Sequence, residues 1–142
     1  MRKLLVRARE RGASAVEFAL VMPLLLLMLM GMIDFGMAIN SQAVLGNAAR
    51  EAARAGSFNA SDTAAAQTVA LNASATLKGA APTVVVTCTT VAGSTINCGS
   101  AEGGDVVKVS MTYRYFWISP AILALPAYTD MEASSQMRIE TT

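Results

Sequence analysis

The sequence lacks histidine altogether, and charged residues make up only 15% of its 142 positions. It also lacks a glycine-rich phosphate loop after a strand and any recognisable nucleophile motif. Two cysteines without histidine are too few ligands for a structural metal site. The sequence therefore predicts no enzyme activity, no cofactor, no metal and no small-molecule substrate.

Positive charge is concentrated at the N-terminus. Residues 1–12 carry five basic side chains and one acidic one, whereas the remaining residues carry six basic and nine acidic ones. A basic cluster can indicate nucleic-acid binding, but this one directly precedes a long apolar segment. The positive-inside rule explains it better, because it retains that end of the chain in the cytoplasm. We therefore expect no nucleic-acid partner.

The apolar segment covers residues 13–33, where Glu17 is the only ionisable side chain. As a helix it would be about 31 Å long, close to the hydrocarbon thickness of a bilayer. A cleaved secretory signal has a shorter apolar core of about 7–15 residues. The segment therefore predicts a retained, single-pass transmembrane helix with the later residues outside the cytoplasm.

The two cysteines lie beyond this segment. Nine residues separate Cys88 from Cys98, with Gly93 and Ser94 midway, as in a turn between two strands. In an oxidising compartment this spacing favours a disulfide that closes a hairpin. A pair of free thiols is the alternative.

The remaining pattern predicts an α+β, pilin-like fold. The long helix should continue to about residue 56, with Gly56 as its C-terminal cap, and a domain should follow over residues 57–142. Ser61 or Asp62 can cap a second helix that extends to about Leu77. Residues 83–91 are rich in β-branched side chains, and residues 107–115 and 131–139 alternate between apolar and polar ones. These segments predict a small antiparallel sheet of three or four strands packed on the long helix.

Residues 116–126 form a second apolar segment, which is bracketed by prolines and too short to span a bilayer. We expect it to cover the sheet as part of the core. Contact with the outer leaflet of the membrane and contact with another subunit are the alternatives.

The junction between the basic and apolar segments resembles a known processing site. Glu17 is the fifth residue beyond Gly12, and the aromatic Phe18 follows it. This is similar to the prepilin peptidase site of type IV pilins and their Tad/Flp relatives, in which cleavage follows the glycine. The resemblance implies cleavage between Gly12 and Ala13, with residues 1–12 as leader. It also implies that Glu17 pairs with the new amino group of a neighbouring subunit, although Glu17 could instead lie at the cytoplasmic interface.

The likeness extends further along the chain, through residues 12–23, Asp34-Phe35-Gly36 and residues 47–55. Together these resemble the N-terminal region of TadE-like proteins. The resemblance implies a minor pilin-like subunit (a pseudopilin) of a bacterial tight-adherence pilus, anchored in the inner membrane. Its implied partners are the prepilin peptidase and the other pilins and pseudopilins of the system. An unprocessed single-pass scaffold of a secretion or pilus complex is the alternative.

Overall fold

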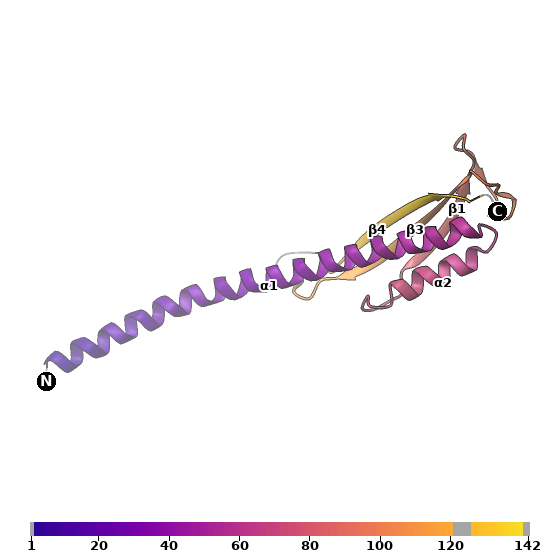
Figure 1. Cartoon of the computed structure of the whole chain (residues 1–142). Helices are drawn as coiled ribbons and strands as arrows, with labels where there is room; N and C mark the ends of the chain where they lie inside the picture. The colour runs from indigo at the N-terminus through magenta and orange to yellow at the C-terminus, as the bar shows by residue number, and fades with distance from the viewer. Residues whose placement is uncertain (1, 121–125, 141–142) are drawn as a thin grey trace. The chain divides into compact units, whose positions relative to one another are not determined.

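The structure is a computed structural model that describes the backbone of residues 2–120 and 126–140, with side chains from Ser14 onward. Its elements in chain order are α1 (Arg2–Phe58), α2 (Thr63–Ala73), β1 (Thr83–Thr89), β2 (Thr95–Ile96), the short 3₁₀ helix η1 (Cys98–Ser100), β3 (Val106–Phe116) and β4 (Tyr128–Arg138) (Figure 1). A long, apolar N-terminal helix and a small antiparallel sheet make this an α+β fold, as the sequence predicts.

The chain forms two compact units, and α1 contributes to both. The N-terminal unit contains residues 1–36 and 117–127, and the sheet unit contains residues 37–116 and 128–142. α1 begins at Arg2, so the helix includes the predicted leader as well as the apolar segment. It also stays helical through Pro23.

The four strands pair in the order β2-β1-β3-β4, and every pairing is antiparallel. In β3, five alternate side chains are buried: Val107, Val109, Met111, Tyr113 and Tyr115. Side chains between them, such as Lys108 and Arg114, are exposed. This period of two is typical of a strand with one face in the core. β3 and β4 thus confirm the two strands predicted from alternation, and β1 confirms the one predicted from β-branched side chains.

The second half of α1 packs on the buried face of the sheet through small side chains. Those fully buried along it are Leu45, Ala48, Ala49, Ala52 and Ala53. Gly56 allows the closest approach, since a Cβ atom there would lie 3.1 Å from Val107 Cγ2 and 3.7 Å from Ala66 Cβ in α2. The prediction that Gly56 caps the helix is therefore wrong. α1 continues to Phe58, and the glycine is where two helices meet one strand.

α2 begins as predicted and ends early. The Asp62 side chain accepts a hydrogen bond from the Ala65 N–H at 2.9 Å, which is the expected N-cap arrangement. The helix ends at Ala73, short of the predicted Leu77. The Ser74 hydroxyl binds the Ala70 carbonyl, and the N–H groups of Ala75 and Leu77 then bond only three residues back. Side-chain to backbone bonding of this kind competes with helix continuation.

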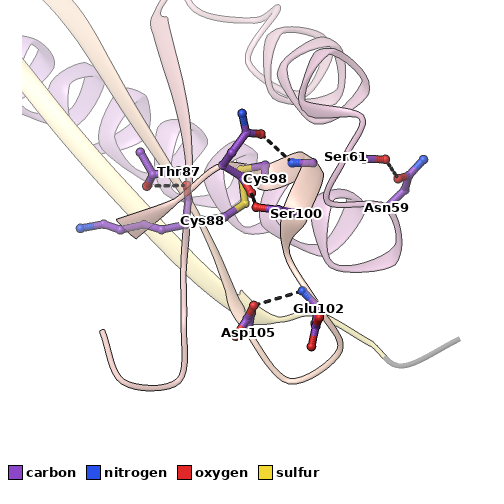
Figure 2. The surroundings of a disulfide bond; sticks show 11 residues. Asn59, Ser61, Thr87, Cys88, Cys98, Ser100, Glu102 and Asp105 are labelled. Carbon is purple, nitrogen blue, oxygen red and sulfur yellow. Dashed lines mark hydrogen bonds between the residues drawn. A yellow bond between two sulfur atoms is a disulfide. The ribbon is translucent and has the colours of Figure 1, made fainter. Parts of the chain in front are cut away.

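The predicted disulfide is present between Cys88 and Cys98 (Figure 2). Cys88 lies in β1 opposite Ile96 of β2, so the bond closes the β1–β2 hairpin two residues beyond this pairing. Cys88 is fully buried in a core cluster with Val107 and Ile139. The disulfide therefore joins the hairpin to the core at the end of the sheet.

Removal of this cross-link should destabilise the sheet unit by about 2–3 kcal/mol, the chain-entropy value for a short closed loop. We expect the Cys88→Ala/Cys98→Ala variant to unfold at lower denaturant concentration, measured on the full chain in detergent. Reduction of the wild type is the control, since it breaks the bond without removing the side chains. The oxidised chain should also be lighter than the reduced chain by the mass of two hydrogen atoms, and equal masses would contradict the disulfide.

Candidate functional site

The first candidate site lies near the N-terminus of α1, at residues 12–18. Gly12 and Ala13, the predicted cleavage position, lie within the helix, and their side chains are outside the described part of the chain. Glu17 and Phe18 lie on the exposed surface of α1, and Phe18 is 62% exposed. Ala13 and Glu17 are four residues apart, so both lie on one face of the helix about one turn apart. The predicted cleavage position and the carboxylate therefore share a face.

Glu17 forms no salt bridge with any basic side chain within residues 14–120 and 126–140. A carboxylate on an apolar transmembrane helix costs about 2.5–3.5 kcal/mol at the bilayer centre on insertion scales, and less near the surface. Two surroundings would satisfy it: water at the membrane surface, or an ammonium group of a neighbouring subunit. The structure is compatible with both.

The residues that follow Glu17 present an apolar surface on all sides. Within the stretch of α1 from Ser14 to Phe58, the most apolar 18 consecutive residues have a mean hydropathy of 2.4, and none of them is buried. Exposed side chains are distributed around the helix: Leu20, Met22, Leu24, Leu25, Met28, Leu29 and Met32. A helix that is apolar all round needs a lipid environment or other apolar helices. The helix is compatible with a single-pass membrane protein.

A comparison with protein families gives a match to the family described as TadE-like protein, over residues 12–54. Over these residues the chain is similar to the TadE-like family. The TadE-like segment begins at Gly12 and includes Glu17, Phe18 and Asp34. Comparisons with curated proteins and with solved structures give no significant match. The family match indicates a pilin-like protein associated with a membrane and with Tad pilus systems.

A second candidate site lies within the N-terminal unit, at the end of the apolar segment. The Asp34 carboxylate is 1% exposed. Its Oδ1 accepts a hydrogen bond from the Ile118 N–H at 2.9 Å, and its Oδ2 accepts one from the Ser119 N–H at 3.0 Å. Asp34 therefore holds the backbone at residues 118–119 against α1.

Neighbouring side chains extend this contact along α1. The Phe35 and Trp117 rings lie 6.4 Å apart between centroids, within the range of aromatic pairs. The Ser119 hydroxyl lies 3.9 Å from the Met30 sulfur. Residues 117–119 therefore contact about one and a half turns of α1, from Met30 to Phe35. We call residues 117–120 the Trp117 turn.

The Trp117 turn corrects the expectation that residues 116–126 cover the sheet. Trp117 belongs to the N-terminal unit, and Ile118 is 58% exposed rather than buried in a core. Residues 121–125 of the predicted segment lie outside the described residues. The sequence singles out Asp34 only as part of the family likeness, and its role was missed. The available signal was an acidic residue directly after the span, where an isolated charge needs a partner.

On the exposed face of the sheet, a third group of side chains joins β3 to β4. Arg114 Nε lies 2.8 Å from Asp130 Oδ1, and the guanidinium carbon lies 4.3 Å from the centre of the Tyr128 ring. The Asp130 hydrogen bond and charge raise the pKa of Arg114, and the Arg114 hydrogen bond lowers the pKa of the Asp130 carboxyl. Both side chains are about half exposed, so this surface pair adds little stability. It is a cross-strand contact of ordinary type.

Within the described residues, no group of three or more Asp, Glu, Cys or His side chains could hold a metal ion.

Proposed function

We propose that the chain is a minor pilin-like subunit required for assembly of a Tad/Flp-type adhesive pilus, matured by prepilin peptidase cleavage after Gly12. The observation that carries this proposal is the start of the family match at Gly12, with Glu17 and Phe18 directly beyond it on α1. In this proposal the protein acts by assembly rather than catalysis. The mature N-terminus is Ala13, and residues 13–33 span the inner membrane with the sheet unit outside the cytoplasm.

The chemistry of the junction supports processing. Glycine has no side chain to obstruct a peptidase at the bond that follows it. Cleavage would give Ala13 a free α-amine, which is mostly protonated near neutral pH. That ammonium, in one subunit, can pair with the exposed Glu17 of a neighbour. An unpaired carboxylate in an apolar bundle is costly, so the pair would favour one register of assembly.

The exposed surface of α1 supports a role in assembly. None of the most apolar 18 consecutive residues of α1 is buried by the rest of the chain. Lipid satisfies this surface before assembly, and the same surface can pack on other pilin helices afterwards.

The alternative is an unprocessed single-pass scaffold of a pilus or secretion complex. One observation fits it: α1 is continuous from Arg2 across the Gly12–Ala13 bond, as in a transmembrane helix that keeps its N-terminal residues. In this alternative Glu17 is an interfacial carboxylate with no part in assembly.

The N-terminal sequence of the membrane-associated protein, isolated from its native host, distinguishes the two. We expect it to begin at Ala13 in cells that have the prepilin peptidase and at Met1 in cells that lack it. A Met1 start in both strains would contradict maturation and favour the scaffold. An Ala13 start in both would assign the cleavage to a different peptidase.

A further inference from the structure

We propose that the Trp117 turn is a membrane-interface anchor. In this proposal Trp117 and Ile118, together with Phe35 of α1, lie at the boundary between headgroups and acyl chains on the side of the bilayer where the span ends. Asp34 holds the turn at that level. The proposal concerns the attachment of the mature chain to lipid, and it does not depend on cleavage after Gly12.

The level of the turn along α1 is the first argument. From Ser14 to Asp34 the helix rises by about 30 Å, which is the thickness of the hydrocarbon core. Asp34 is also the first ionisable residue after Glu17. The contacts of the turn with Met30, Asp34 and Phe35 therefore lie where an upright span leaves the bilayer.

The hydrogen bonds of Asp34 are the second argument. Irregular backbone at the edge of a bilayer has little water to satisfy its N–H groups, and an unsatisfied buried group costs free energy. The N–H groups of Ile118 and Ser119 are both satisfied by the Asp34 carboxylate. The carboxylate in turn is buried and hydrogen-bonded rather than isolated. This arrangement lets a non-helical turn lie beside the helix at a water-poor level.

The exposed side chains at this level are the third argument. Ile118 is 58% exposed and Phe35 is 62% exposed, next to Met32 at 69% and Ile33 at 46%. They continue the exposed apolar surface of the span. The lipid that surrounds the span can therefore cover these side chains as well, without another protein. Tryptophan, with an apolar ring and a polar N–H, is enriched at this boundary of membranes.

Trp117 is the only tryptophan in the chain, so its fluorescence reports on the turn without further labelling. We would reconstitute the full chain in vesicles of phosphatidylcholine and phosphatidylglycerol with bromine either near the headgroups or near the bilayer centre. The proposal predicts stronger quenching of Trp117 by shallow bromine than by deep bromine, and weak quenching by aqueous acrylamide. Flotation of the protein with the vesicles establishes separately that the span is inserted.

Two variants test whether Ile118 and Asp34 hold Trp117 at the membrane boundary. Ile118→Asp puts a charge on the exposed surface and keeps the backbone N–H that Asp34 binds, so shallow quenching should fall; Ile118→Leu should leave it unchanged. Asp34→Ala removes the acceptor of both N–H groups and should raise acrylamide quenching. Its matched control is Asp62→Ala, which removes a carboxylate that also accepts a backbone N–H but lies in the sheet unit.

Each remaining outcome overturns the proposal. Quenching by acrylamide but not by bromine in floated vesicles would place the turn in water. Quenching by neither would place Trp117 against protein, including a second copy of the chain. Stronger quenching by deep bromine would place Trp117 in the hydrocarbon core. Failure of the protein to float would show that α1 does not insert into the bilayer. None of these outcomes changes the N-terminal sequence, so the anchor and the proposed maturation can fail independently.

Discussion

Replacement of Gly12 by aspartate should leave residues 1–12 attached to the protein and abolish its function in pilus assembly. The carboxymethyl group would stand beside the bond to be cleaved, where glycine presents only hydrogen. It would also place a negative charge next to the basic cluster of residues 1–12. We expect nearly all of the membrane-associated Gly12→Asp chain to start at Met1, measured by N-terminal sequencing or intact mass.

The matched control for this substitution is Gly36→Asp. Gly36 lies in the same helix, and a Cβ atom there would meet nothing within 4 Å, so the side chain can be accommodated. If cleavage is specific to the Gly12 position, the Gly36 variant should start at Ala13 like the wild type. An Ala13 start in the Gly12→Asp chain would show that the glycine is not needed. Loss of cleavage in both variants would indicate a general effect of added charge on membrane insertion.

The fold could be predicted from local pattern wherever one face of an element is buried. In β3 and β4 the apolar positions recur every second residue, and the strands lie where that alternation predicts them. Cys88 and Cys98, placed on either side of a turn, predicted the hairpin. β2 has only two residues, Thr95 and Ile96, and is too short for a pattern of its own. It could be inferred only through the cysteines.

Helix ends were less predictable than helix interiors. The basic residues of the predicted leader are as good helix formers as the apolar residues after them, so nothing local marks a start at Arg2. Gly56 has the residue type of a cap but the surroundings of a packing position, because β3 passes within van der Waals distance. The hydroxyl bond of Ser74 at the end of α2 is one that many serines inside helices also make, so it does not mark a helix end in the sequence.

The candidate sites differ in how many of their residues could be predicted from the sequence alone. Glu17 and Phe18 were predicted from their spacing from Gly12, since the resemblance to a peptidase site rests on contiguous residues. The role of Asp34 depends on Ile118 and Ser119, which lie 84 and 85 positions away in the chain. A single sequence carries no signal for contacts at that separation. Only the folded chain brings the carboxylate and the two N–H groups together.

Replacement of Glu17 by glutamine should leave cleavage intact and reduce the recovery of the protein with its pilus partners by at least about tenfold, the effect of losing about 1.4 kcal/mol of binding free energy. Glutamine has nearly the same size and keeps a hydrogen-bond acceptor, but it carries no charge to attract the Ala13 ammonium of a neighbour. The carboxylate lies five residues beyond Gly12, on the exposed surface of α1. Co-purification of tagged protein from detergent-solubilised membranes measures the loss, and N-terminal sequencing of the same sample verifies cleavage.

Two further substitutions separate charge from general damage to α1. Glu17→Asp keeps the charge on a shorter side chain and should recover part of the association. Glu51→Gln removes an exposed carboxylate from the same helix, at a position that belongs to the sheet unit, and should change nothing. Normal association of the cleaved Glu17→Gln chain would show that the ammonium pair is not used. Glu17 would then be a carboxylate hydrated at the membrane surface, and the register of assembly would have to come from the apolar faces of α1.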